Sequence, residues 1–148
     1  MVNDNIKITG DVKIDIIGAD GAVKDSREIK NLVVTTGKTF IASRMVGTSA
    51  NVMGWMELGT GTTAAVVGDT ALEAAISGSR VALTSGTSAT NVVTYVASFP
   101  AGTGTGAVTE AGVFNAASAG TMLCRTVFSV VNKGAADAMS ITWTITVS

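Results

Sequence analysis

The stretch at residues 139–148, "MSITWTITVS", decides the fold class of this chain. Apolar residues alternate along it with serine and threonine, at Ile141, Trp143, Ile145 and Val147. Successive side chains of a β-strand point to opposite faces of the sheet. The pattern therefore predicts a strand with one face buried and the other in water.

Apolar stretches of similar length run back along the chain from this strand. They cover residues 52–63, 79–85, 89–99, 106–116 and 121–131. Glycine-rich turns separate the later ones, at 100–106, 115–120 and 132–137. This spacing favours an antiparallel β-sandwich or jelly-roll-like fold over alternating strands and helices. Residues 68–77 are predicted to form either a helical turn capped by Asp69 or an ordered loop.

Residues 11–34 predict an N-terminal β-hairpin. Val12, Ile14 and Ile16 alternate with polar residues, and Asp20-Gly21 supplies a turn that accepts positive φ. The return strand is expected at residues 29–34, with Asn31 facing away from the core.

The apolar period changes after this hairpin, at residues 36–45. Phe40, Ile41, Arg44 and Met45 recur at helical spacing. The pattern predicts one short α-helix, and Thr35 or Thr36 is placed to cap its N-terminus.

Gly37-Lys38-Thr39, at the start of this helix, matches the end of a phosphate-binding loop. The full motif needs a glycine five residues before Gly37, and Leu32 stands there. The β-branched Val33 and Val34 prefer extended backbone to the curl that such a loop requires. We therefore expect Gly37 to end a strand, Lys38 to lie in the exposed first helical turn, and no nucleotide to bind.

Length and composition predict one domain, residues 1–148. The charged N-terminal segment, residues 1–34, is a possible projecting hairpin arm, and residues 47–148 would form the sandwich body. Only 14% of the residues are charged, against about 25% in an average domain. Two explanations stay open: part of the surface contacts other subunits, or serine and threonine cover the sheet.

The composition also argues against several partners and cofactors. The net charge is −1 and the basic residues form no run, so nucleic acid is not an expected partner. The chain has no histidine and one cysteine, Cys124, which predicts no metal site, no disulfide and no cofactor. We expect Cys124 to be a buried apolar residue. The sequence shows no signal peptide and no apolar run of about 20 residues, so neither export nor a membrane is expected.

Catalysis is not expected, and the chain is predicted not to be an enzyme. The carboxylates that deserve consideration are scattered along the sequence, at Glu57, Asp69, Glu73 and Glu110. The commonest general base, histidine, is missing. Glu110 interrupts an apolar strand, and a buried structural ion pair with Arg125 or Arg80 is favoured over an active-site role. The tryptophans and phenylalanines in predicted strands are expected to pack in the core.

The order of several sequence blocks resembles small virion structural proteins of tailed bacteriophages, from about Ile14 to the end of the chain. These blocks are "IKNLVVTTGKTFIASRM", "MELGTGTTAAVVGDTAL", "SRVALTS", "NVVTYVASFPAGTGTGAVTEAGVFNA" and "GTMLCRTVFSVVNKGAADAMSITWTITVS". The resemblance is to capsid decoration (cement) proteins and to components of tails and fibres.

The resemblance implies a non-enzymatic structural role. A decoration protein would bind the outside of the shell, stabilise contacts between major capsid proteins and form a homotrimer. It would be assembled in the host cytoplasm and end in the virion. The alternative is a tail-fibre, adaptor or baseplate component involved in host attachment. No motif of the family fixes the interface residues.

Overall fold

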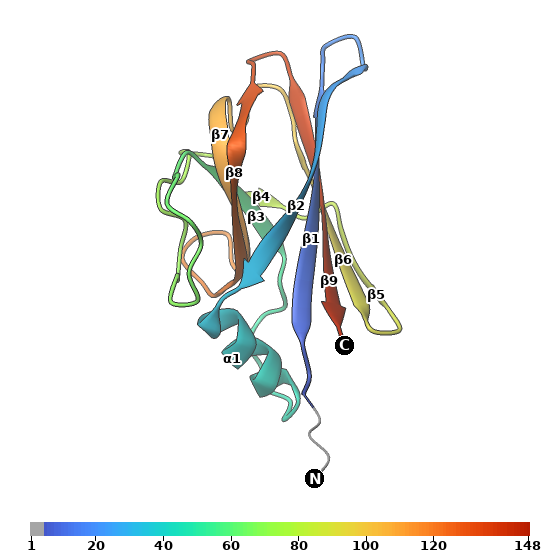
Figure 1. Cartoon of the computed structure of the whole chain (residues 1–148), viewed down its shortest axis with the longest axis vertical. Coiled ribbons are helices and arrows are strands. Elements are labelled where there is room, and N and C mark those ends of the chain that lie inside the picture. The colour runs from blue at the N-terminus through green and yellow to red at the C-terminus, as the bar shows by residue number, and fades with distance from the viewer. Residues whose placement is uncertain (1–4) are drawn as a thin grey trace.

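The computed structural model describes residues 5–148 and consists of strands with a single helix (Figure 1). The strands are β1 (Ile8–Ile17), β2 (Val23–Val33), β3 (Trp55–Gly59), β4 (Val81–Ala82), β5 (Ser85–Ala89), β6 (Val92–Phe99), β7 (Gly106–Phe114), β8 (Met122–Lys133) and β9 (Ala138–Val147). The helix is α1 (Thr35–Arg44). The predicted mainly β class, the N-terminal hairpin and the single short helix are confirmed.

All nine strands belong to one antiparallel sheet that curls on itself, in the order β4-β3-β7-β8-β2-β1-β9-β6-β5. Because β2 pairs with β1 along most of its length and with β8 at its last residues, it joins the two halves of the sheet. The two separate sheets of a sandwich or jelly roll are therefore not confirmed. One buried apolar cluster takes residues from both halves, including Trp143 of β9 and Val113 of β7.

The hairpin is part of the sheet rather than a projecting arm, so that prediction is wrong for its described residues. Strand β1 pairs with β9 from Ile8↔Val147 to Ile17↔Ala138, and its Val12 and Ile14 are buried in the core. The apolar alternation of β1 explains this position in the sheet, because the apolar face of the strand must be buried against the core. Residues 1–4 of the predicted arm lie outside the described residues.

Asn31 faces the core side of β2, not away from the core as predicted. It shares its face with Ile29 and Val33 and lies opposite Gly10 of β1. A Cβ on Gly10 would come within 1.6 Å of the Asn31 Oδ1 atom, so glycine makes room for this amide. The prediction from polarity was wrong, because Gly10 on the neighbouring strand leaves space for the Asn31 side chain on the core side of the sheet.

Helix α1 begins at Thr35, and its N-cap residue is Val34, so the predicted threonine cap is absent. The Thr36 hydroxyl donates instead to the Met122 carbonyl at 2.9 Å, and the Thr35 N–H donates to the Val67 carbonyl at 2.8 Å. Gly37 lies inside the helix rather than at the end of a strand, while Lys38 is exposed as predicted. The first turn of the helix is thus hydrogen-bonded to β8 and to the loop that contains Val67.

Gly37 is where α1 meets the backbone of β8, and replacing it with alanine is expected to destabilise the protein. An added Cβ would lie 2.0 Å from the Leu123 carbonyl oxygen. Alanine favours a helix by about 1 kcal/mol over glycine, but overpacking costs about 1–3 kcal/mol. We expect a lower midpoint of urea unfolding for Gly37→Ala. Gly68→Ala, where an added Cβ meets nothing within 4 Å, is the control, and an equal shift for both variants would contradict the prediction.

Candidate functional site

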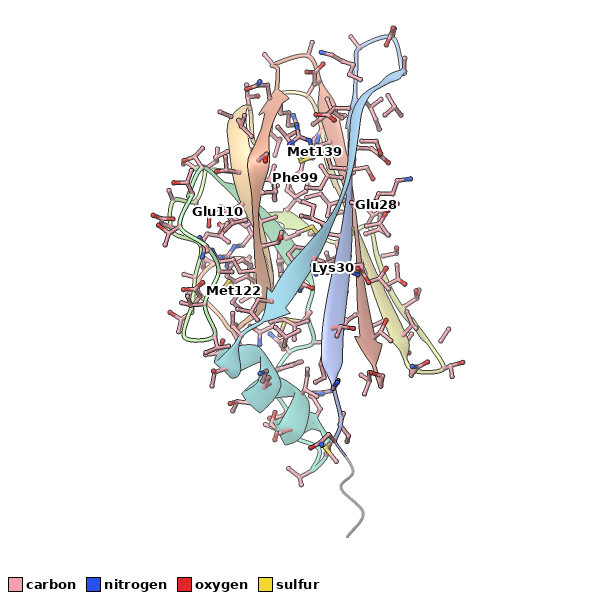
Figure 2. The ribbon with its side chains drawn as sticks, viewed as in Figure 1. Glu28, Lys30, Phe99, Glu110, Met122 and Met139 are labelled. Atoms are coloured by element: carbon pink, nitrogen blue, oxygen red, sulfur yellow. The ribbon has the colours of Figure 1, made fainter. Side chains whose placement is uncertain are left out.

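The most polar part of the interior is an ion-pair cluster between β7, β8 and the loop at residues 60–78 (Figure 2). The side chains of Glu110 and Arg125 are 0% and 2% exposed. Arg125 Nε donates to Glu110 Oε2 at 2.9 Å, and Arg125 Nη2 lies 2.9 Å from the same oxygen as part of the ion pair. The predicted burial of Glu110 in a structural ion pair is confirmed, and Arg125 is the partner.

Two further carboxylates from loop 60–78 complete this group, which we call the Arg125 cluster: Arg125, Glu110, Asp69 and Glu73. Arg125 Nη1 lies 2.7 Å from Asp69 Oδ2, and Nη2 lies 3.6 Å from Glu73 Oε2. Nη2 also donates to the Thr63 carbonyl at 3.1 Å. Carboxylates that are scattered in the sequence therefore converge on one guanidinium.

Glu110 also holds the backbone of loop 60–78. Its Oε1 accepts the N–H groups of Gly61 at 3.0 Å and Ala74 at 2.7 Å, and its Oε2 accepts that of Glu73 at 3.1 Å. An added Cβ on Gly61 would lie 2.6 Å from Oε1. Both carboxylate oxygens are saturated with donors and closely packed, which leaves no lone pair or space for acid–base work on a substrate. The cluster fixes a loop.

The remaining candidate carboxylate, Glu57, stands apart in a second ion pair. Arg80 donates to it from Nε at 3.1 Å and from Nη2 at 3.0 Å. The Arg80 guanidinium also lies 3.8 Å from the centre of the Phe114 ring, a cation–π contact. Among the described residues no group of carboxylates or cysteine is placed to hold a metal ion.

The pKa values in the Arg125 cluster follow from these contacts. Burial alone would raise the pKa of Asp69, but hydrogen bonds from the Val66 N–H and from Arg125 outweigh burial and lower it. Hydrogen bonds from Thr63 lower the pKa of Glu73. Burial would lower the pKa of Arg125, and its bonds to Asp69 and Glu110 raise it. All three groups are therefore held in their charged forms.

Acid is expected to loosen loop 60–78. The pKa of Asp69 is lowered from 3.8 and that of Glu73 from 4.5. A carboxylate with a depressed pKa stabilises the fold fully above its unfolded pKa, and this contribution is lost as the pH falls through the folded pKa. We expect amide exchange in the loop, corrected for intrinsic rates, to accelerate as the pH falls below about 4. Asp69→Asn should reduce this acid response, and an unchanged response would contradict the assignment.

Cys124 is fully buried in β8, as the sequence predicted. Burial raises the pKa of its thiol far above the ordinary value. A thiol that stays protonated and inaccessible is not a nucleophile.

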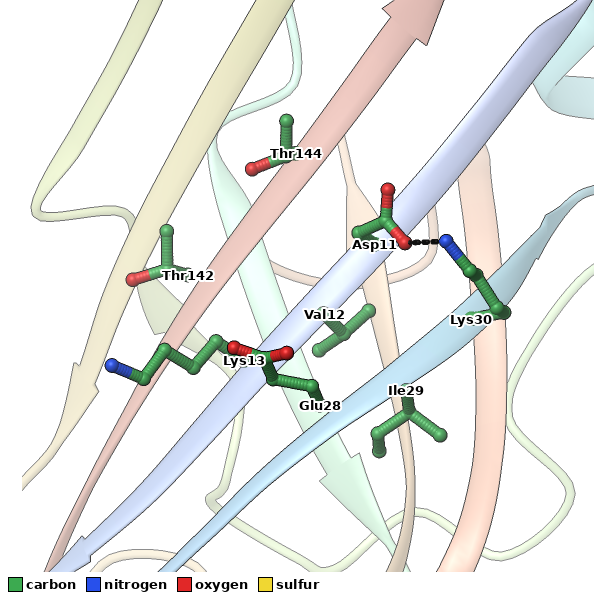
Figure 3. Close-up of a pocket in the computed structure, with 8 residues that line it drawn as sticks. All are labelled: Asp11, Val12, Lys13, Glu28, Ile29, Lys30, Thr142 and Thr144. Atoms are coloured by element: carbon green, nitrogen blue, oxygen red, sulfur yellow. Dashed lines mark hydrogen bonds and ion pairs between the residues drawn. The ribbon is translucent and has the colours of Figure 1, made fainter.

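A polar groove of about 510 Å³ lies over β2, β1 and β9 (Figure 3). Lys13 faces Glu28 across the β1–β2 register, and Lys30 forms an ion pair with Asp11. Thr142 and Thr144 of β9 complete its polar lining. Opposite charges that face each other across strands are typical of a solvated sheet face, and no aromatic ring lines the groove for a sugar or base to stack on.

Exposed apolar side chains gather at the end of the molecule that carries α1, and we call this surface the helix end. Met45 is 83% exposed and Val46 is 84% exposed, directly after the helix. Ile6 and Val147 are also exposed, and they line one groove with Met45. Val67, which is exposed as well, lies near the start of α1, because its carbonyl accepts the Thr35 N–H.

A groove of about 670 Å³ runs through the helix end between α1 and the start of β1. It is lined by Ile6, Lys7, Ile8, Thr9, Lys38, Ile41, Ala42, Met45 and Val147. Sequence reasoning missed this surface, because its residues come from the first strand, the helix and the last strand. The only signal was the low charge of the chain, for which contact with other subunits was one of two explanations.

Comparison with known proteins found no matching family model, no matching curated protein and no matching solved structure. The one helix within residues 5–148, α1, is not long and apolar enough to cross a membrane.

Proposed function

We propose that this chain is a structural virion protein of a tailed phage. It acts as a capsid decoration or cement protein that binds the outside of the shell and stabilises contacts between major capsid proteins. The observation that carries the proposal is the helix end, where large apolar side chains are exposed together. Large exposed apolar side chains that lie close together, as Ile6, Met45 and Val147 do around one groove, mark a protein–protein contact.

The other candidate chemistry in the molecule supports an adhesive role without catalysis. Glu110, Asp69 and Glu73 are engaged in holding a loop, and Cys124 is buried. Each 100 Å² of apolar surface that a contact buries contributes about 2.5 kcal/mol. A homotrimer would bind through several such contacts at once, and avidity makes modest contacts strong.

Density maps of purified virions, compared with those of virions that lack this protein, test the proposal directly. We expect the chain on the outer surface of the shell, with its helix end against the major capsid protein. Virions without it should lose infectivity at lower temperature and at milder osmotic shock. Equal resistance of the two preparations would refute the cement function.

The number of copies per virion separates this role from the alternative in the tail. Hundreds of copies fit a protein that covers the shell, because each capsid face repeats its binding site. About a dozen copies would fit a fibre, adaptor or baseplate component, and quantitative mass spectrometry against the major capsid protein measures the ratio.

A further inference from the structure

Within residues 5–148, the start of β1 has one backbone edge without a strand partner, and this edge lines the apolar groove. Lys7 exchanges two hydrogen bonds with Ser148, N–H to O at 2.6 Å and O to N–H at 2.8 Å. In an antiparallel pair the residues alternate in direction, so the N–H and C=O of Ile8 point away from β9, toward the groove. Ile8 is one of the residues that line the groove.

Strand β2 does not cover this edge. Its pairing with β1 begins at Gly10↔Asn31, and its next residues, Leu32 and Val33, pair instead with Arg125 and Cys124 of β8. The chain then turns into α1. Among residues 5–148, the backbone groups of Ile8 on this side therefore have no strand partner.

The charge of the groove is one-sided. Within residues 5–148, its charged lining residues are Lys7 and Lys38, both exposed, and no carboxylate of this part of the chain lines it. Its other lining residues are apolar apart from Thr9. A partner that fits this chemistry brings apolar side chains for the floor and carboxylates for the two lysines.

We propose that this groove binds an extended segment of a partner protein, which adds to the edge of β1 as a further strand. Main-chain hydrogen bonds to Ile8 fix the segment, as in other cases of strand addition. Alternate side chains of the segment are apolar and contact Ile41 and Met45, and its acidic residues meet Lys7 and Lys38. The inference deepens the proposed function and rests on it only for the source of the segment, the major capsid protein.

Selection of a random heptapeptide library on the full-length chain tests the proposal. We expect the enriched peptides to alternate apolar residues with aspartate or glutamate. Ile8→Pro removes the N–H that the added strand needs, while the bonds between Lys7 and Ser148 remain, so enrichment should fall at least tenfold. Ile8→Val keeps the N–H and is the matched control. Amide exchange at Ile8 should slow when a selected peptide binds.

Charge reversal provides a second test, which does not require that the proline variant folds. Lys7 and Lys38 are exposed, so the double variant Lys7→Glu/Lys38→Glu should fold normally. The enriched peptides should then carry lysine or arginine in place of acid. Unchanged charge preference, peptides without apolar alternation, no enrichment on the parent chain, or unaltered exchange at Ile8 would each overturn the proposal.

These outcomes are separate from the test of the proposed function. If the protein is found in the tail and its selected peptides behave as expected, the cement role is refuted and the strand-addition site is supported. If it is found on the shell but selects no such peptides, the cement role is supported and the strand-addition site is refuted.

Discussion

Glu110→Ala is expected to lower the free energy of unfolding by about 3–5 kcal/mol, because it removes the one fully buried carboxylate that pairs with the buried Arg125. Arg125 is 2% exposed and would lose the carboxylate that accepts from its Nε and lies 2.9 Å from its Nη2. The N–H groups of Gly61, Glu73 and Ala74 would also lose their acceptor. A chain of this size has about 5–15 kcal/mol in total, so the expected loss is a large fraction of its stability.

Urea unfolding followed by circular dichroism measures this loss, and two further variants make the result specific. Asp11→Ala removes an exposed ion pair with Lys30 and should change stability by less than about 1 kcal/mol. The double variant Glu110→Leu/Arg125→Met removes both buried charges. It should be more stable than Glu110→Ala, because both variants lose the acceptor of the loop N–H groups, but only Glu110→Ala keeps a buried guanidinium without its Glu110 carboxylate. A loss below about 1 kcal/mol for Glu110→Ala would show that the pair does not hold the loop.

The sequence predicted the elements of the fold better than their assembly. Alternation in β1 and β9 identified strands, because burial of one face dictates that pattern locally. The curl of the sheet was not predictable, because it depends on Leu32 and Val33 leaving β1 for β8. Nothing in the periodicity of residues 29–34 marks that change of partner.

The Arg125 cluster was predictable only in part. Glu110 in an apolar strand indicated a buried ion pair, since an unpaired buried carboxylate is too costly. Asp69 and Glu73 gave no such signal, because they lie in a loop where polar residues are ordinary. Only the path of loop 60–78 brings them to Arg125. Gly37 likewise matched a nucleotide motif, although the structure uses it for the close approach of α1 to Leu123.

The double variant Met45→Glu/Val46→Glu is expected to fold normally and yet to be lost from virions, if the helix end is the adhesive surface. Both side chains are more than four-fifths exposed, so the free energy of unfolding should change by less than about 0.5 kcal/mol. In a contact the new carboxylates would be buried without partners, which costs several kcal/mol. A cost of about 2.7 kcal/mol already corresponds to a 100-fold weaker affinity.

The matched control places the same charges at the opposite end of the molecule. Val23 and Val130 are also exposed, at 59% and 44%. Val23 is the first residue of β2 and Val130 is near the end of β8, and Figure 1 shows these two strand ends away from α1. Val23→Glu/Val130→Glu should therefore leave the number of copies per virion unchanged, as counted by mass spectrometry against the major capsid protein. Because both pairs add the same charge, general repulsion from the shell would remove both variants alike. Equal loss of the two, or retention of the Met45 and Val46 variant, would mean that the helix end is not the surface that attaches the protein.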